Sequence, residues 1–530
     1  MKKIAIDTSV LSEIIGQGCI YVDKTRCCLD MIESGKFFFL ARPRRFGKSL
    51  MVDTLANILQ GNRKLFEGTY IWDKYAFDPS PVLRFSMNDL RAGSFEVNVK
   101  LLMNSIASKA EEFGIPLDTS VEEPFFHFAQ LIRGVSKKYG RQVAVLIDEY
   151  DYPLMDSVAD LSRFVKMRDM LSSFYETLKV EEASVRFCFI TGITRFPHVS
   201  IFSKLNNLID ITNDPKYASI CGYSDDELDT YFGPYVEKHF SDSAISDEEG
   251  KRAFRQTIKE YYDGYRFCVE DDVTLYNPVS VGKFFMNGCV FRNYWIGTGA
   301  QSLVNSLVGA NSAFFKDKSD FVIPVSELDT FSLEDLAGRS ASRESIYSFL
   351  VQAGYMTIKG LDGGRLRLGY PNREVADTIE ARVLASYGLK IDSSVLRCLR
   401  AALADGDTPY AMQIIHEVFV DIPYDLFLEK ENNYQIAFFM LLKHLGFSSV
   451  NAEERTNIGR MDLSLVVGKE HVYIFELKLD GSADKALRQI KEKKYFEKYM
   501  ACGVRIHLLG INFSSRERNI VDWKEDVLEG

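Results

Sequence analysis

A chain of 530 residues is too long for one hydrophobic core, so we expect roughly two to four domains. Its content of 46% hydrophobic and 26% charged residues is typical of a soluble globular protein, and no apolar run approaches the roughly 20 residues of a membrane span. The net charge of −10 argues against a simple, non-specific nucleic-acid binder, so any nucleic acid would have to be held by a local basic surface.

The nine cysteines are scattered and include no C-x-x-C pair, which excludes a zinc ribbon and argues against a framework of disulfides. The N-terminus starts basic but continues without a long apolar segment or a small-residue cleavage site, so we expect no signal peptide. These features predict a protein of the reducing cytoplasm with no membrane partner.

Apolar strands and helical patterns alternate along the first part of the chain. Strand-like runs cover residues 37–43, 81–87, 141–151, 184–192 and 207–212, and the helical patterns between them include 93–113 and 124–139. Such alternation predicts an α/β layer built on a mainly parallel sheet.

The stretch ARPRRFGKSL, residues 41–50, lies between the first strand and the following helix and ends like a phosphate-binding loop. In such a loop, backbone N–H groups and a helix N-terminus surround the phosphates, the lysine reaches the β and γ oxygens, and the hydroxyl residue holds magnesium. Gly47, Lys48 and Ser49 stand where this chemistry needs them, whereas Arg42 replaces the first glycine of G-x-x-x-x-G-K-[ST]. Taken alone the signal is weak, because a lysine also stands at many ordinary helix starts.

A second element strengthens the nucleotide hypothesis. The apolar strand VAVLIDEYD ends in Asp148 and Glu149. The first carboxylate suits magnesium coordination through water, and the second suits polarising the attacking water, although a strand followed by an acidic turn is the alternative. Both elements in this order predict an ATP–Mg²⁺ site. We expect the nucleotide to be bound by Arg45, Phe46, Gly47, Lys48, Ser49, Leu50, Asp148 and Arg195, with the magnesium held by Ser49 and Asp148.

Polar side chains beside this site have more than one interpretation. Thr191, Thr194 and Arg195 end the strand at 184–192 and would sense the γ-phosphate, with a capped strand end as an equal alternative. The arginines of residues 42–45 would face the nucleotide, a neighbouring subunit of a homo-oligomer, or nucleic acid, and a solvated basic loop is the alternative.

The middle of the chain changes to helices with an aromatic, loop-rich interruption at 261–280. Residues 344–375 have the order helix, strand, glycine-rich turn at 363–364, strand. This order predicts a small winged-helix-like module, with a plain hairpin-and-helix subdomain as the alternative. Residues 376–445 are expected to be mostly helical.

The C-terminal end forms its own α/β unit in this interpretation. The strands RMDLSLVV and HVYIFELKL are followed by a charged helix at 483–500 and the strand VRIHLLGINF. Asp462 lies on the first strand, and Glu476 and Lys478 share one face of the second, because alternate residues of a strand point the same way.

These three residues suit metal-assisted phosphodiester hydrolysis. The carboxylates of Asp462 and Glu476 would hold Mg²⁺, and Lys478 would orient the water or stabilise charge. The alternative is a salt bridge of Lys478 with one of the acids. Gln489, on the following helix, is either an accessory site residue or a surface polar residue.

These stretches together resemble a known family. The motifs are YVDKT (21–25), RPRRFGKS (42–49), LIDEYD (146–151), FSKLNNL (202–208), YYDGYRF (261–267), YNPVS (276–280), GYPNREV (369–375) and GRMDL with FELKLDGSADKALRQIKEKKY (459–463 and 475–495). They closely resemble bacterial AAA-ATPase-like proteins with a C-terminal PD-(D/E)XK nuclease-superfamily domain, and the resemblance spans nearly the whole chain. In that family RPRRFGK itself forms the loop.

The resemblance implies an α/β fold in three parts. Residues 1–225 would form a P-loop NTPase domain with an ASCE/AAA-like parallel sheet, 226–410 a helical lid and winged-helix-like region, and 411–530 a restriction-endonuclease-like α/β domain. It also implies Asp148 and Glu149 as the Walker B pair, and Asp462, Glu476 and Lys478 as the nuclease-like core with Gln489 as an accessory.

The function expected first is an ATPase that gates an Mg²⁺-dependent nuclease acting on nucleic acid, DNA ahead of RNA. Asp462, Glu476 and Lys478 occur together, whereas a degenerate site would usually have lost one of them. The alternatives are a nucleotide-dependent switch whose nuclease fold only binds, and an ATPase that remodels a protein partner, which the acidic charge fits best.

Overall fold

The chain divides into two compact units in the computed structural model. The first unit contains Met1–Thr298 and Val322–Val375, and the second contains Gly299–Phe321 and Ala376–Gly530. The predicted boundaries at 225 and 410 therefore stay predictions. The structure describes residues 1–90, 93–195, 201–202, 205–241, 248–295, 301–315, 321–337, 341–386, 391, 393–420, 431–445, 447, 449–455, 460–500 and 502–530.

A five-stranded, fully parallel sheet forms the centre of the first unit. Its strand order is β2-β3-β4-β1-β5. The bounds are β1 Phe37–Ala41, β2 Val82–Ser86, β3 Val143–Asp148, β4 Val185–Gly192 and β5 Ile209–Asp210. This confirms the predicted parallel sheet. Because the strands are parallel, the loop after β1, the acids after β3 and the residues after β4 all lie at one edge of the sheet.

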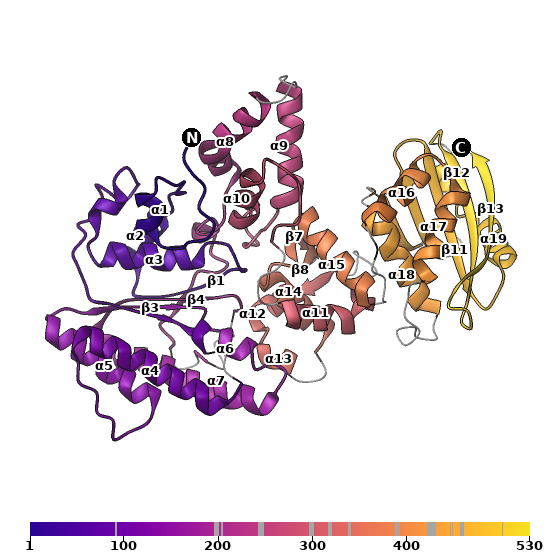
Figure 1. Ribbon diagram of the computed structural model, residues 1–530. Coiled ribbons are helices and arrows are strands. Elements are labelled where there is room, and N and C mark those ends of the chain that lie inside the picture. The colour runs from indigo at the N-terminus through magenta and orange to yellow at the C-terminus, as the bar shows by residue number, and fades with distance from the viewer. Residues whose placement is uncertain are drawn as a thin grey trace. The chain divides into compact units, whose positions relative to one another are not determined.

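Helices cover both faces of this sheet (Figure 1). On one side lie α1 Leu11–Gly16, α2 Thr25–Ser34 and α3 Lys48–Leu59, and on the other α4 Phe95–Phe113, α5 Pro124–Tyr139 and α7 Leu161–Val180. Local signals set these bounds: Ser94 accepts a hydrogen bond from Val97 N to cap α4, and Gly114 and Gly140 end α4 and α5 in the left-handed conformation. All five residues of β1 and all six of β3 are buried, as expected of a sheet covered on both faces.

The remainder of the first unit is mostly helical. Its elements are α6 Tyr152–Met155, α8 Asp225–Ser241, α9 Glu248–Tyr262, α10 Pro278–Met286, β6 Val322–Pro324, α12 Val325–Thr330, α13 Leu333–Ala337, α14 Arg343–Gln352, β7 Thr357–Asp362, β8 Arg365–Gly369 and the start of α15 Arg373–Ser386. The predicted order of helix, strand, glycine turn and strand is confirmed by α14, β7 and β8. Gly363 and Gly364 form the turn with positive φ, and β6 completes a three-stranded sheet.

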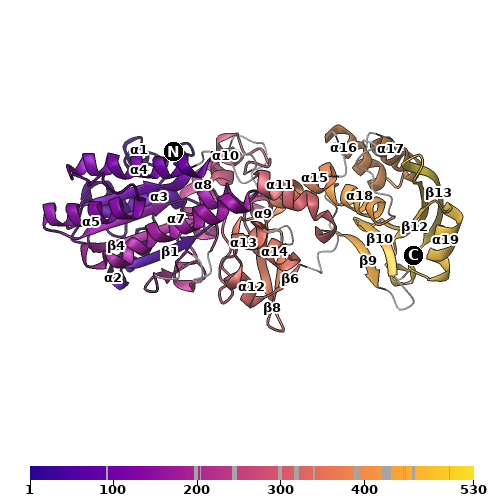
Figure 2. The ribbon, with the colours of Figure 1, turned by 90° about the horizontal axis from the view of Figure 1, so that it is seen from below.

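A mixed five-stranded sheet, of order β13-β12-β11-β10-β9, forms the second unit with helices on both faces (Figure 2). The strands are β9 Ser449–Arg455, β10 Arg460–Val467, β11 His471–Leu479, β12 Arg505–Ser514 and β13 Asn519–Glu529. The helices packed with this sheet are α16 Ser393–Ala404, α17 Thr408–Val420, α18 Glu431–His444 and α19 Ala483–Glu492, and the unit also contains α11 Gln301–Ala310. Strands β11 and β12 run parallel because α19 connects them as a crossover.

The helix predicted for 483–500 is shorter in the structure. It ends at Glu492, and Lys494 adopts φ 49°, a left-handed conformation that turns the chain. The turn lets Tyr495 pack into the core of the sheet beside Ile474 and Ile490. Across the described residues, no helix has the combined length and hydropathy that crossing a bilayer requires.

Candidate functional sites

The loop that joins β1 to α3 has the conformation of an anion cradle. Gly47 adopts φ 95° and Arg45 φ 68°, so the loop turns back on itself before α3 begins at Lys48. Among the described residues, no side chain caps the N-terminus of α3. Its first N–H groups are therefore available to phosphate oxygens, and the loop fits this ligand.

Arg42 has a structural role in this loop. Its guanidinium is 1% exposed, stacks on Phe267 at 4.3 Å, and donates hydrogen bonds to the carbonyl oxygens of Thr212 at 2.7 Å and Tyr217 at 3.1 Å. Burial lowers its pKa to about 10. The side chain ties the strand exit to the segment after β5. The expectation that this arginine faces nucleotide, a second subunit or nucleic acid is wrong, because the guanidinium is fully enclosed.

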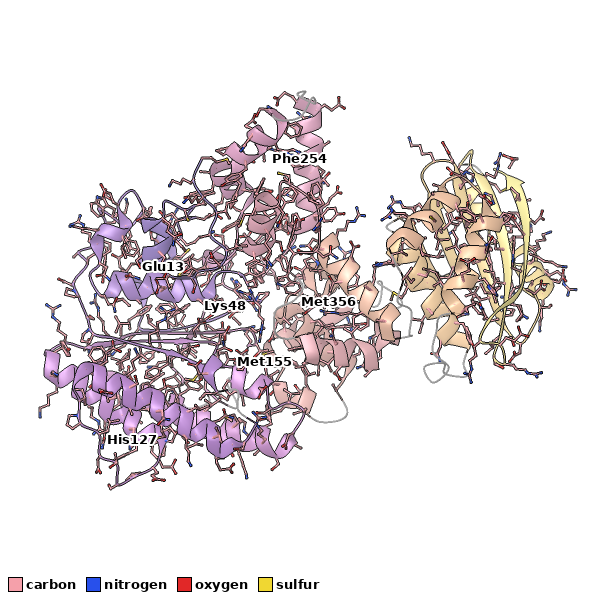
Figure 3. The ribbon with its side chains drawn as sticks, in the orientation of Figure 1. Glu13, Lys48, His127, Met155, Phe254 and Met356 are labelled. Carbon is pink, nitrogen blue, oxygen red and sulfur yellow. The ribbon has the colours of Figure 1, made fainter. Side chains whose placement is uncertain are left out.

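Lys48 lies at the start of α3 with its ammonium folded back on the loop (Figure 3). Its Nζ donates hydrogen bonds of 2.9 Å to the carbonyl oxygens of Arg42 and Pro43. The side chain is 6% exposed, and burial lowers its pKa, while the nearby Asp148 and Glu149 carboxylates oppose that shift. A buried ammonium whose hydrogen bonds, among the described residues, go to backbone carbonyls is a suitable partner for a phosphate.

The chain turns sharply at Asp148 and Glu149, where β3 ends. Asp148 is buried, and its Oδ1 accepts a hydrogen bond from Glu149 N at 3.0 Å. Glu149 adopts φ 53°, a strained conformation for a residue with a side chain, and lines the pocket described next. Burial, followed by the charge of Asp148, raises the pKa of the Glu149 carboxyl. A base with a raised pKa at a strained position suits proton abstraction from water.

The loop opens into a pocket of about 420 Å³, a size that holds small-molecule ligands. Arg44, Arg45, the residues 46–51 and Glu149 contribute to its lining. Most of the remaining wall comes from segments 5–9, 20–22, 220–223 and 278–279, which were not predicted as site residues. The signal was present in YVDKT and YNPVS, which were quoted for the resemblance without a role.

Two of the residues expected to bind nucleotide have other contacts. The Phe46 ring is buried against Tyr265, with centroids 4.8 Å apart, so the backbone of Phe46 is what the pocket can use. Arg195 forms an ion pair of 2.6 Å with Asp210 and lines a separate cavity of about 40 Å³. The geometry does not support Arg195 as a nucleotide ligand, because Asp210 on β5 holds its guanidinium.

The threonines at the end of β4 are also engaged. Thr191 donates to the carbonyl oxygen of Leu40 at 2.8 Å, and Thr194 Oγ1 donates to Asp151 Oδ2 at 2.6 Å. Asp151 also accepts from the backbone N–H groups of Ile193 and Thr194. These contacts match the alternative of a capped strand end. Asp151 thereby ties the loop after β3 to the end of β4.

The second site lies on β10, β11 and α19. Asp462 on β10 comes one position before Leu463, which pairs with Phe475 on the antiparallel strand β11. This register sets Asp462 opposite Glu476. Asp462 Oδ2 accepts a hydrogen bond from Leu477 N at 2.9 Å. Glu476 Oε1 accepts from Lys478 Nζ at 2.9 Å and from Gln489 Nε2. The structure brings all four predicted residues together.

Close packing of α19 on the sheet explains how Gln489 reaches this site. Gly510 on β12 is the register partner of Glu476. A Cβ on Gly510 would lie 2.3 Å from the carbonyl oxygen of Ala483 and 2.6 Å from Leu487 N, both on α19. Only glycine lets the helix approach this closely, and the approach delivers Gln489 to the Glu476 carboxylate.

The carboxylate of Glu476 has an oxygen available to bind a cation. It is 1% exposed, and its Oε2 has no hydrogen-bond partner among the described residues. Burial, followed by the charge of Asp462, raises the pKa of Glu476 to about 7, while Lys478 opposes the shift. The salt bridge offered as the alternative is present, but it leaves Oε2 unsatisfied. A buried, orphaned carboxylate oxygen beside a second carboxylate is the oxygen donor set that Mg²⁺ prefers, so the residues fit this ion.

Glu476 also predicts how the stability of the metal-free protein changes with pH. The folded chain holds the Glu476 proton more tightly than the unfolded chain, whose carboxyl has the ordinary pKa of 4.5. Proton binding by Glu476 therefore contributes its full stabilisation of the folded state below pH 4.5, and this contribution is lost as the pH rises through about 7. In the presence of a chelator, the free energy of unfolding of the wild-type protein, taken relative to that of Glu476→Gln, should therefore fall by up to about 3 kcal/mol between about pH 5 and about pH 8.

The measurement is thermal unfolding of both proteins across this range. The difference between the two proteins reports on Glu476 together with the charged groups it contacts, Asp462 and Lys478, since titrating groups elsewhere contribute equally to both. Added Mg²⁺ should restore wild-type stability at the alkaline end and leave the variant unchanged. A pH-independent difference would contradict the buried, proton-binding state of Glu476.

Each candidate site lies in a segment that matches a known family. Residues 5–202 match the family model described as "Predicted AAA-ATPase", and residues 429–523 match the PD-(D/E)XK nuclease superfamily. A protein of Azotobacter chroococcum mcd 1, described as "Uncharacterized protein in vnfD 5'region", is 33% identical over 545 residues, which cover 99% of each chain. The phosphate loop lies within the first match and the carboxylate cluster within the second. With similarity along its full length and both domains in place, the chain belongs to the AAA-ATPase-like proteins that carry a C-terminal PD-(D/E)XK nuclease-superfamily domain.

Proposed function

We propose that the chain is an ATP-dependent nuclease, in which ATP binding and hydrolysis in the first unit gate metal-dependent cleavage of nucleic acid by the second. The observation that carries this proposal is the Glu476 carboxylate. Its Oε1 is held by Lys478 and Gln489, and its buried Oε2 has no partner among the described residues. A buried carboxylate oxygen without a hydrogen bond destabilises the folded protein, and a module that only binds nucleic acid does not require one beside Asp462.

In the first unit, ATP would lie in the 420 Å³ pocket with its phosphates on the loop. Lys48 would exchange its two carbonyl partners for phosphate oxygens. Ser49 and Asp148 would hold the magnesium of the nucleotide, and Glu149 would take the proton of the attacking water.

In the second unit, Asp462 and Glu476 would hold a divalent metal. A bound Mg²⁺ would supply Lewis-acid activation of the phosphodiester and of a water molecule. Lys478 would orient that water or stabilise the charge that develops on the phosphate. Gln489 fixes the rotamer of Glu476 through its hydrogen bond to Oε1.

The direct test is a cleavage assay with the full-length protein. Mg²⁺ or Mn²⁺ is supplied with and without ATP, on linear, circular and single-stranded DNA and on RNA. We expect metal-dependent cleavage that ATP changes, with DNA as the better substrate. ATP turnover without cleavage of any of these substrates would favour the second candidate, a nucleotide-dependent protein remodeller, which the net charge of −10 fits.

Replacing Glu149 with glutamine should separate ATP binding from hydrolysis. The amide keeps the size of the side chain but accepts no proton from water, so turnover should fall about a hundredfold or more while ATP affinity is retained. Phosphate release and calorimetric ATP binding are measured on the same preparation. Asp156→Asn is a matched control, because Asp156 lies in the same region but pairs with Arg163. Equal phosphate release by Glu149→Gln and wild type would remove Glu149 from the role of base.

A further inference from the structure

Three sequence motifs to which the proposed reaction assigns no chemical step meet beside the phosphate loop. They are YYDGYRF (261–267), YNPVS (276–280) and GYPNREV (369–375). Gly264 of the first adopts φ 101°, and a Cβ there would lie 2.1 Å from the carbonyl oxygen of Pro371 in the third. Only glycine permits this contact between the two motifs.

The phosphate loop rests on an aromatic platform in this region. Trp295 Nε1 donates to the carbonyl oxygen of Arg44 at 3.3 Å, and the Trp295 ring packs on Tyr355 with centroids 4.8 Å apart. A Cβ on Gly354 would lie 2.7 Å from Pro43, so the loop sits directly on the chain at this point. The loop is therefore held at Pro43 and Arg44 by Gly354 and Trp295.

Glu374 connects this platform to a helix. It is 0% exposed; its Oε1 accepts a hydrogen bond from Trp295 N, and its Oε2 accepts one from Ser280 Oγ at 2.8 Å. Glu374 is the second residue of α15, and α15 continues past Val375, the last residue of the first unit. An unbroken series of contacts thus runs from Arg44 through Trp295 to Glu374 in the first turn of α15.

The loop also has an identifiable reason to move. Lys48 Nζ bonds the carbonyl oxygens of Arg42 and Pro43, and the carbonyl of the next residue, Arg44, accepts from Trp295. When phosphates take the hydrogen bonds of Lys48, the two carbonyls lose that partner, and the adjoining peptides would reorient unless water replaces it. The change arises one peptide away from the bond to Trp295.

We propose that Trp295 and Glu374 form a strut that couples the phosphate loop to the start of α15, so that nucleotide binding at the loop changes the stability of that helix. This rests on the proposed function in one respect, since it needs a nucleotide at the loop. Glu374 acts as a positioning residue: it touches neither nucleotide nor nucleic acid, and holds Trp295 and α15 in a fixed relation.

Hydrogen exchange followed by mass spectrometry tests the strut in the full-length protein. With ATP and Mg²⁺, amide exchange in peptides covering 373–386 should slow about three- to tenfold, the effect of about one hydrogen bond. In Glu374→Ala, which removes both acceptor oxygens, ATP should still bind but this protection should disappear. Should that variant not fold, Ser280→Ala removes one donor to the same carboxylate and should weaken the protection.

A second readout reports on Trp295 alone. The chain has three tryptophans, and Trp72→Phe with Trp523→Phe leaves Trp295 as the sole emitter. Its fluorescence should change on addition of ATP and Mg²⁺ with the same Kd as calorimetry gives. Asp263→Asn is the matched control, because Asp263 is a buried carboxylate of this region that accepts from Thr274. It should keep both responses.

The outcomes separate this inference from the proposed function. ATP binding by calorimetry without a change at 373–386, or with the same change in a folded Glu374→Ala protein, overturns the strut and leaves the nucleotide site intact. Failure of the wild-type protein to bind ATP overturns the nucleotide site itself, and the strut with it.

Discussion

Lys48→Ala should weaken ATP binding by a hundredfold or more. Lys48 supplies a buried ammonium next to the uncapped N-terminus of α3, and its contacts at present are backbone carbonyls of its own loop. Two charge-assisted hydrogen bonds to phosphate contribute about 3–6 kcal/mol, which corresponds to a factor of about 100 or more in Kd. Calorimetry with ATP and Mg²⁺ measures the loss.

Lys36→Ala is the matched control for this variant. Lys36 precedes β1 and therefore lies at the opposite edge of the parallel sheet from the loop, where its Nζ donates to the carbonyl oxygen of Glu182. Its removal should leave ATP affinity unchanged. Thermal unfolding shows whether Lys48→Ala keeps its fold. A folded Lys48→Ala protein that binds ATP as tightly as wild type would disprove the nucleotide site.

The parallel sheet and the loop could be predicted because their signals are local. Each buried strand is an uninterrupted apolar run, and Gly47-Lys48-Ser49 marks the point where a strand gives way to a helix. The roles of Arg42 and Arg195 could not be predicted in this way. Arg42 binds carbonyl oxygens about 170 residues further along the chain, and Arg195 pairs with Asp210 on a different strand. Such contacts exist only once the sheet has formed.

The second site also combines features that the local sequence predicts with features that depend on the folded structure. Alternation along β11 places Glu476 and Lys478 on one face, but the register that sets Asp462 opposite Glu476 depends on the β10–β11 turn. Strand β13 was missed because charged residues such as Lys524 and Glu525 interrupt its apolar positions at the edge of the sheet. The burial of Glu476, with its Oε2 unpartnered among the described residues, could not be predicted, because it depends on the close packing of α19 against Gly510.

Asp462→Ala should remove both metal binding and nucleic-acid cleavage. Glu476 alone supplies one carboxylate, and a lone carboxylate holds Mg²⁺ poorly, because the ion retains its waters unless several oxygens replace them. Cleavage should therefore fall by about a thousandfold or more if the reaction depends on the metal throughout. Calorimetric titration with Mn²⁺ measures the metal, and gel-based assays measure the cleavage. Asp484→Ala is the control, because Asp484 is an exposed acid of α19 that pairs with Lys524.

Lys478→Ala separates the nuclease from a mere salt bridge. Lys478 Nζ lies 2.9 Å from Glu476 Oε1 and is a cation, so it cannot ligate metal; its loss should leave metal binding in place and lower cleavage by about a hundredfold. The salt-bridge interpretation predicts a different result. Asp462→Ala and Lys478→Ala would both lower the stability of the protein, and neither wild type nor variant would show metal-dependent cleavage. Metal binding that survives Asp462→Ala would exclude the shared-ion site. Metal binding that depends on Asp462, in a wild-type protein that cleaves nothing, would make the second unit a binding module that has kept the geometry of a nuclease without its turnover.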